Sequence, residues 1–187
     1  WISKSPFRDK LKIRNLIKLP LFSMRKPDLN LGRTINVGIL GCGWAGASAH
    51  GPALERIKNV KIVAVCDVST ERADHTSRKF NCKAYYDLED MINSERIDVV
   101  VNCTPEIHHY PTTLKLLDAG IDVFCEKIMA ESYDKALEMV DKSKDNNRVL
   151  AVNYNYRFIP GIIRIKQLIE SEEFGKLVNL NIFVHAF

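Results

Sequence analysis

The chain of 187 residues is 46% apolar and 27% charged, a composition typical of a folded globular protein with one or two domains. Residues 1–33 contain nine Lys or Arg and only two Asp, so the net charge of +4 comes from this segment and the remainder of the chain is acidic. An acidic body argues against a nucleic-acid surface, and no apolar run approaches the roughly 20 residues that a membrane-spanning helix needs.

The basic residues 1–33 form the first segment of the chain. We expect a poorly ordered extension here, because Lys, Arg and Asn interrupt every apolar stretch before Leu19 and no secretory signal can be read. The stretch LKIRNLIKLPLF is weakly amphipathic, which leaves a transit peptide and a membrane-surface anchor as alternatives. The chain begins at Trp1 and stops within the strand-like NIFVHAF, so we expect a truncated piece of a longer protein.

The cysteines are odd in number and form no Cys-x-x-Cys pair, and four of the five fall in or beside strand-like runs. This pattern favours small, reduced, buried side chains in a cytoplasmic protein over disulfides or metal ligands. We therefore expect no metal site. The five are Cys42, Cys66, Cys82, Cys103 and Cys125.

From residue 34 to residue 154, short apolar runs alternate with helical patterns. The runs are nearly continuous in apolar residues, as strands buried on both faces should be. Such alternation predicts an α/β domain, a Rossmann-type doubly wound parallel sheet with right-handed crossovers. The expected strands are 35–40, 61–67, 98–104, 122–126 and 149–154. The expected helices are 45–57, 69–80, 87–94, 109–119 and 132–145, with N-caps at Ser69 or Thr70 and at Ser132 and a stop at Gly120.

The pattern changes after Tyr154. Residues 155–187 read as a loop, a helix over 160–171, a turn at 174–176 and a strand that alternates from Val178 onward. Alternation of this kind is typical of a sheet with one solvated face. We interpret the segment as the incomplete beginning of a second, α+β domain.

A glycine-rich loop follows the first expected strand and leads directly into a helix. Gly41 permits the tight turn, Gly43 lets the backbone approach a pyrophosphate, and Gly46 lets the helix pack against the strand. Phosphates are favoured at a helix N-terminus by its unpaired N–H groups and its dipole. The spacing predicts a dinucleotide site that includes the loop residues Trp44 and Ala45.

Asp67 stands 21 positions past Gly46, at the end of the second expected strand. A carboxylate at this place accepts hydrogen bonds from the adenosine ribose hydroxyls. The alternative is a turn residue that caps the next helix. Because a carboxylate repels a 2′-phosphate, the sequence favours NAD over NADP. NADP remains possible because Arg72 could reach such a phosphate.

Further residues give the chain a resemblance to a known family. Thr104-Pro105 with His109 follows one strand, and Glu126-Lys127 follows the segment DAGIDVFC. Together with the glycine loop, with NYRF at 155–158 and with FGKLVNL, these motifs resemble the glucose-fructose oxidoreductase, inositol dehydrogenase and rhizopine-catabolism (Gfo/Idh/MocA) family over residues 34–187.

The resemblance implies that Lys127 lies beside the nicotinamide and polarises the reacting hydroxyl while hydride moves to the ring. It implies that Glu126 orients Lys127 or touches the nicotinamide ribose. Thr104, Pro105 and His109 would line the cofactor site, because ligands bind beyond the carboxyl ends of parallel strands. The alternatives are an exposed Glu-Lys surface pair and, for His109, a helix-cap or surface histidine at the opening of the fourth helix.

Two histidines outside this set are interpreted as structural. His50, on the first helix, is expected to be a packed structural residue rather than a catalytic one. His108 is expected to lie on the surface.

The sequence departs from the family pattern in two places. Ile128 stands where the family has proline after Glu-Lys, and the family's Asp-x-x-x-His pair is not found after Asn153. We expect these residues to supply the cofactor half of an active site. Tyr154 and Arg157 could line the substrate side of the cleft or pin the crossover between the two domains.

The most favoured function is that of an NAD(P)-dependent oxidoreductase, which moves hydride between a nicotinamide and a hydroxyl carbon of a sugar, a cyclitol or a related polyol. The resemblance implies that the second domain holds the substrate and that the full-length form is a homo-oligomer. The alternatives are a non-catalytic nucleotide-binding regulator and an inactive truncated fragment.

Overall fold

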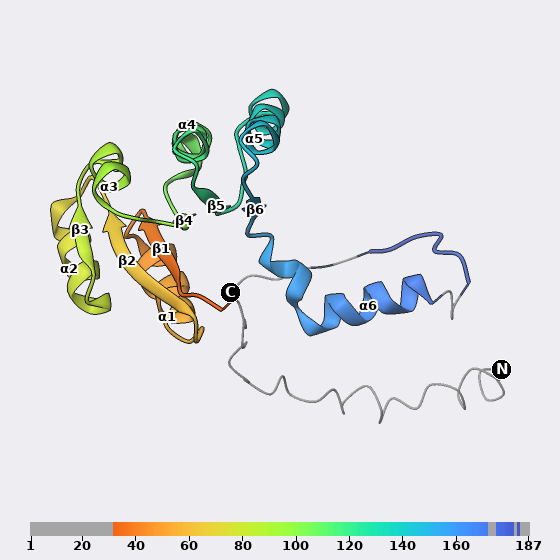
Figure 1. The fold of residues 1–187 in the computed structure, drawn as a ribbon. Coiled ribbons are helices and arrows are strands. Elements are labelled where there is room, and N and C mark those ends of the chain that lie inside the picture. Colours follow the sequence, from red (N-terminus) through yellow and green to blue (C-terminus); the bar gives the residue numbers. More distant parts are fainter. Residues whose placement is uncertain (1–31, 172–174, 182, 184–187) are drawn as a thin grey trace, which may run out of the picture.

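The computed structural model describes residues 32–171, 175–181 and 183. They form an α/β domain around a six-stranded parallel sheet with the strand order β3-β2-β1-β4-β5-β6 (Figure 1), which confirms the expected Rossmann-type fold. The strands are β1 (Ile35–Leu40), β2 (Val60–Cys66), β3 (Lys83–Tyr85), β4 (Val99–Asn102), β5 (Asp122–Cys125) and β6 (Leu150–Val152). The helices are η2 (Trp44–His50), α1 (Gly51–Leu54), α2 (Thr70–Phe80), α3 (Leu88–Ser94), α4 (Glu106–Asp118), α5 (Tyr133–Asp145), η3 (Asn155–Phe158) and α6 (Pro160–Glu170).

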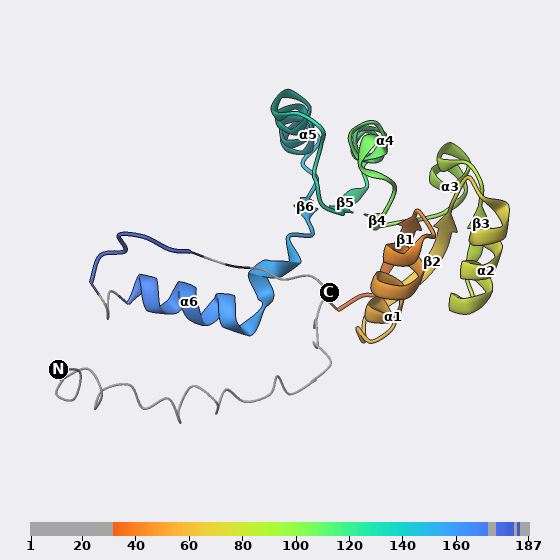
Figure 2. The ribbon, with the colours of Figure 1, turned by 180° about the vertical axis from the view of Figure 1, so that it is seen from behind.

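Helices cover both faces of the sheet, and each face has its own apolar core (Figures 1 and 2). On one face, Met91 of α3 and Leu116 and Leu117 of α4 are fully buried against the sheet. On the other face, Phe80 of α2 packs on Ile39 and its neighbours. Burying each such side chain contributes about 1.5–3 kcal/mol, so the two cores hold the strands in one continuous sheet.

The register of the parallel strands brings their carboxyl ends to one level. Leu40 pairs with Cys66 on one side and with Asn102 on the other. Asn102 pairs in turn with Cys125, which pairs with Val152. The ladder continues one residue further, where Cys103 N donates to Leu40 O at 2.7 Å and Glu126 N donates to Asn102 O at 2.9 Å. The residues that follow the strands therefore share one edge of the sheet.

Side-chain caps stand at the helix starts that the sequence predicts. The hydroxyls of Ser69 and Ser132 accept hydrogen bonds from backbone N–H groups of α2 and α5, and Asp87 does the same for α3. Gly120, with φ of +75°, follows the end of α4. These caps fix where each helix starts relative to the strand before it.

Two helices differ from the expected ranges. The first begins as the π-helical η2 and continues as α1 only to Leu54, short of the expected end at Ile57, with Pro52 in the first turn of α1. The fourth begins at Glu106, three residues before the expected His109, with Pro105 as its N-cap residue. The short edge strand β3 was not expected, since three residues give too little pattern to read.

The segment after β6 stands apart from the sheet. Both views show α6 away from the other helices, connected through η3 (Figures 1 and 2). The strand expected from Val178 is not formed in the described residues 175–181 and 183; a strand needs a partner to pair with. The remaining positions of that strand, and residues 1–31 of the extension expected over residues 1–33, lie outside the described residues. The division into three segments stays a prediction.

The contact between α1 and α2 leads to a stability prediction. A Cβ on Gly51 would come within 2.2 Å of the Phe80 ring, whereas a Cβ on Gly161 in α6 would meet nothing within 4 Å. We expect Gly51→Ala to lower the free energy of unfolding by about 1–3 kcal/mol through overpacking. Gly161→Ala serves as the control and should raise it slightly by improving helix propensity. Urea unfolding measures both, and equal stability of the two variants would contradict the packing described here.

Candidate functional site

The carboxyl edge of the sheet gathers most of the residues that the sequence singles out. The glycine loop leaves β1, Asp67 follows β2, and Glu126 and Lys127 follow β5. Thr104 lies two residues beyond the end of β4. In a doubly wound sheet a ligand binds at this edge, where the strand order reverses between β1 and β4.

The glycine loop has the geometry that its three glycines suggest. Gly41 has φ of +92°, and a Cβ there would lie 2.6 Å from Cys103 O, so the loops after β1 and β4 approach closely only because this residue has no side chain. A Cβ on Gly46 would lie 2.1 Å from Gly41 O. A Cβ on Gly43, in contrast, would meet nothing within 4 Å, so the loop leaves open space on that side. The neighbouring Trp44 is 78% exposed.

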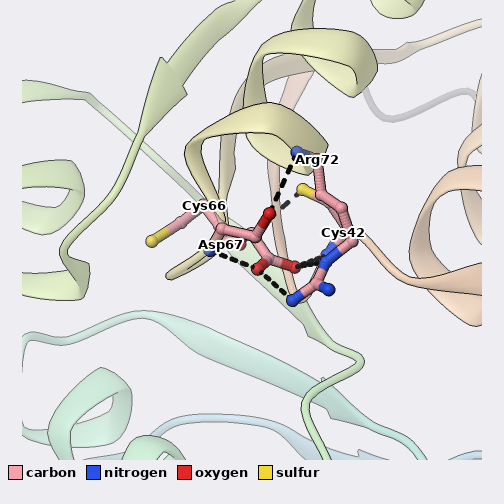
Figure 3. Close-up of polar contacts among 5 residues, drawn as sticks. Cys42, Cys66, Asp67 and Arg72 are labelled. Carbon is pink, nitrogen blue, oxygen red and sulfur yellow. Dashed lines mark hydrogen bonds and ion pairs between the residues drawn. The ribbon is translucent and has the colours of Figure 1, made fainter.

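Asp67 is buried and forms the centre of a polar cluster (Figure 3). One carboxylate oxygen, Oδ2, accepts from Cys42 N in the glycine loop at 2.8 Å. The other, Oδ1, accepts from Ser69 N at 2.8 Å. Asp67 therefore ties the glycine loop to the start of α2. The N-cap residue of α2 is Ser69, and Asp67 bonds to the N–H of that residue, so the contact belongs to the turn before the helix.

Arg72 covers the Asp67 carboxylate. Its Nη2 donates to Oδ1 at 2.7 Å and its Nε donates to Oδ2 at 3.2 Å. Burial raises the pKa of Asp67, but the hydrogen bonds from Arg72, Ser69 and Cys42 outweigh it and lower that pKa below its usual value. The carboxylate is thus charged at neutral pH. The Arg72 side chain is 54% exposed against 6% for Asp67, so the guanidinium lies on the solvent side of the pair.

The cysteines beside this cluster are free thiols. Cys42 and Cys66 are buried, and burial raises the pKa of the Cys42 thiol to about 11 and that of Cys66 to about 12. A thiol with such a pKa is protonated at neutral pH and is a poor nucleophile. These side chains therefore act as small apolar residues under the loop.

His109 occupies a different place from the one expected. It lies in the second turn of α4, where it is 1% exposed, instead of opening the helix or lying on the surface. Its Nδ1 is 2.6 Å from Ile128 O and its Nε2 is 2.8 Å from Thr104 O. Both partners are carbonyl oxygens, which can only accept, so a ring N–H of His109 is the donor in these contacts. His109 thereby joins the loop after β4 to the loop after β5.

Asn102 holds the other side of the β4 loop. This buried side chain accepts from the hydroxyl of Thr104 at 2.7 Å and donates to the hydroxyl of Thr112 in α4 at 2.7 Å. Thr104 is therefore positioned from both directions, by Asn102 through its side chain and by His109 through its carbonyl. The sequence did not single out Asn102, although a polar residue at the end of an apolar strand is a usable signal.

Glu126 forms a second carboxylate cluster, on the other side of the glycine loop. Its Oε1 is 2.6 Å from His50 Nε2 and 2.8 Å from Asn153 Nδ2, and its Oε2 accepts from Lys127 N at 3.1 Å. Burial raises the pKa of Glu126, but hydrogen bonds from His50, Asn153 and the Lys127 amide outweigh it, so that the pKa is lowered. This is not the exposed surface pair that stood as the alternative.

Lys127 itself is exposed, so the described residues do not desolvate its side chain. The peptide bond from Lys127 to Ile128 is cis. Pro105, Tyr154 and Arg157 are also exposed, and no side-chain contact places the last two against the residues named above. The role of each predicted site residue stays a prediction.

Among the described residues, no group of three or more His, Cys, Asp or Glu side chains is arranged to hold a metal ion. Nor does any helix in this part of the chain have the length and apolar character needed to cross a membrane.

Residues 35–154 match the model of an oxidoreductase family with an NAD-binding Rossmann fold, Gfo/Idh/MocA. The chain belongs to this family. The expected resemblance is thereby confirmed, and these residues are the NAD-binding domain of a Gfo/Idh/MocA protein.

Characterised relatives and solved structures agree with this membership. The chain is 32% identical to inositol 2-dehydrogenase of Rubrobacter xylanophilus over 75% of its own length and 41% of the relative's. It is 29% identical to D-glucoside 3-dehydrogenase of Escherichia coli, over 76% and 41% of the two chains. The WlbA dehydrogenase of Bordetella pertussis, solved with NADH and UDP-GlcNAcA, superposes with a TM-score of 0.73 at 26% identity over 76% and 44%. The chain thus spans less than half the length of these Gfo/Idh/MocA relatives.

The two hydrogen bonds of His109 lead to a prediction. We expect His109→Leu to lower the free energy of unfolding by about 1–3 kcal/mol for each carbonyl that loses its donor. The adjacent His108, which is exposed, provides the control, and His108→Leu should change stability little. Thermal or urea unfolding distinguishes the two, and equal loss in both variants would contradict the bridge between the two loops.

Proposed function

We propose that this chain is the cofactor-binding part of an NAD-dependent dehydrogenase. One observation carries the proposal: the open glycine loop, the charged Asp67 and Lys127 lie on one edge of one sheet, at the ends of β1, β2 and β5. This arrangement can hold the two halves of a dinucleotide on either side of the loop and present a lysine at the far side. Family membership supports the same function.

The residues present fit a dinucleotide. The open side of Gly43 allows a pyrophosphate to approach the backbone, and the start of η2 at Trp44 and Ala45 would offer N–H groups to it. Asp67 would accept from the adenosine ribose. When bound, the nicotinamide supplies the hydride acceptor or donor. In this proposal these residues bind and orient the cofactor and take no part in the transfer of the substrate's proton.

Lys127 would act on the substrate. As an ammonium it can donate a hydrogen bond to the reacting oxygen and stabilise the negative charge that develops there. Glu126 fixes the main chain at Lys127, because its Oε2 accepts from the Lys127 amide. Thr104, Pro105 and His109 would shape the floor between the glycine loop and Lys127. Tyr154 and Arg157 would line the substrate side.

The substrate proposed is a sugar, a cyclitol or a related polyol. The support comes from the relatives, whose names include an inositol dehydrogenase and a glucoside dehydrogenase. Such substrates are small, and the reaction requires no metal in this scheme. A cytoplasmic location and a homo-oligomeric full-length form belong to the same proposal.

The pair of Asp67 and Arg72 sets the choice between NAD and NADP. A ribose hydroxyl can bond to Asp67 only where Arg72 gives up its hold on the carboxylate. Once released, the half-exposed guanidinium lies where it could meet a 2′-phosphate. The proposal is therefore a preference for NAD, with NADP accepted through Arg72.

Titration with NADH and NADPH, followed by nicotinamide fluorescence, tests the cofactor site. We expect Asp67→Ala to weaken NADH binding about tenfold and NADPH binding less, because a hydrogen bond to a charged acceptor is lost only for the ribose hydroxyl. Arg72→Ala should weaken NADPH binding and leave NADH binding equal or tighter. Arg78→Ala, an exposed arginine on the same helix, is the control for charge. Equal effects of Asp67→Ala on both cofactors would overturn its assigned role.

A second test addresses Lys127 and uses the longest protein product that contains this chain. Lys127→Ala should spare NADH binding and lower turnover of a sugar or cyclitol about a hundredfold or more, since the group that polarises the oxygen is lost. Lys61→Ala removes an exposed lysine from β2 and should leave turnover unchanged. Retained turnover in Lys127→Ala would remove this residue from the mechanism. Binding of NADH with no turnover in the unsubstituted protein would favour a nucleotide-binding regulator instead.

A further inference from the structure

His50 makes a contact that its place in the sequence does not suggest. It is the last residue of η2, the helix that begins in the glycine loop, and its Nε2 lies 2.6 Å from Oε1 of Glu126, which is 76 positions away in sequence. Both side chains are mostly buried, with 16% and 17% exposed. A carboxylate can only accept, so Nε2 of His50 carries the hydrogen whether the ring is neutral or charged.

The Glu126 carboxylate links His50 to Lys127, because it forms hydrogen bonds with both residues. Oε1 also accepts from Asn153, while Oε2 accepts from the main-chain N–H of Lys127. Three donors from three parts of the chain therefore determine how the carboxylate lies: the end of η2, the residue after β6 and the lysine itself. The His50 ring also packs against Phe124 in β5 in a T-shaped contact, with the ring centres 5.7 Å apart and the planes at 80°, which adds a second contact to the imidazole.

The other ionisable groups near His50 and Glu126 are two neutral thiols and a lysine that bonds to a backbone carbonyl. The thiols of Cys103 and Cys125 interact electrostatically with Glu126, and burial raises both of their pKa values, that of Cys125 to about 12, so both are neutral. From α2, Lys79 reaches η2 and donates to Ala47 O at 2.7 Å. Neither cysteine competes with His50 as a partner for the carboxylate. His50 and Asn153 are thus the side-chain donors that hold Glu126 in place.

We propose that His50 is a positioning residue for Lys127. By holding Glu126, it fixes the main chain of the lysine and ties it to the same helix whose beginning would receive the cofactor phosphates. This role rests on the proposed function and extends it, because it makes the placement of the reactive lysine depend on the glycine-loop helix. A histidine that only filled space would not need Glu126, and an apolar residue would fill the same space without burying a charge.

The test uses the Lys127 amide in NMR spectra of the ¹⁵N-labelled chain without cofactor. We expect His50→Leu to move the Lys127 amide resonance and to speed its hydrogen exchange about tenfold, because the acceptor Oε2 is no longer held. His50→Gln keeps a side-chain N–H donor and should restore both quantities toward the original values. His75→Leu, which changes an exposed histidine on α2, is the control and should leave them unchanged.

An unchanged Lys127 amide in a folded His50→Leu variant would overturn the proposal. Should that variant fail to fold, His50→Phe takes its place, since it keeps an aromatic ring at this position and removes the Nε2 donor to Glu126; an unchanged resonance there would also overturn it. Because no cofactor is present, these outcomes are independent of the NADH titration. If the unsubstituted chain fails to bind NADH while the Lys127 amide resonance still moves in His50→Leu, the proposed function is wrong and the positioning contact remains supported.

Discussion

The parallel register of the strands is the constraint on which the rest of this structure depends. Leu40, Asn102 and Cys125 lie level with one another at the ends of β1, β4 and β5. A side chain alternates between faces along a strand, so a shift of one residue would invert the face and displace the end of that strand by about 3.3 Å. Such a shift would take Glu126 out of reach of His50. The two apolar cores maintain the register and thereby the edge.

Close approach of backbone segments is the second requirement, and it explains why glycine stands directly after β1, at Gly41, and within η2, at Gly46. Gly41 places its backbone against Cys103 O, and Gly46 places its backbone against Gly41 O. In both cases a methyl group would meet main-chain atoms that cannot move aside without breaking the ladder. Glycine at these two positions costs conformational entropy on folding, but it permits the close backbone contacts. The same loop leaves its outer side open at Gly43.

The sequence predicted the features that depend on local pattern. Apolar runs located β1, β2, β4, β5 and β6, and the serine caps located α2 and α5. The loop of glycines and the position of Asp67 followed from spacing alone. The edge strand β3 was missed because three residues carry almost no periodicity.

What the sequence could not predict depends on contacts between distant residues. His109 was placed at a helix opening, and its burial between Thr104 O and Ile128 O became visible only once two loops were brought together. His50 and Glu126 are separated by eight elements in the chain order, from α1 to β5. The local sequence around a histidine in a helix does not indicate its partner, because the pairing depends on the tertiary structure.

The two charged clusters on the edge differ in a way that indicates different roles. Asp67 is held by an arginine that is more than half exposed, so this partner has solvent to move into, and the carboxylate would keep the N–H groups of Cys42 and Ser69 as donors. Glu126 is held by a histidine that is mostly buried and fixed against Phe124, so its partner has no comparable exit. Removing either partner from a buried pair leaves an uncompensated charge. The first carboxylate is therefore suited to exchange its partner for a ligand, and the second to keep its partner and hold the chain beside it still.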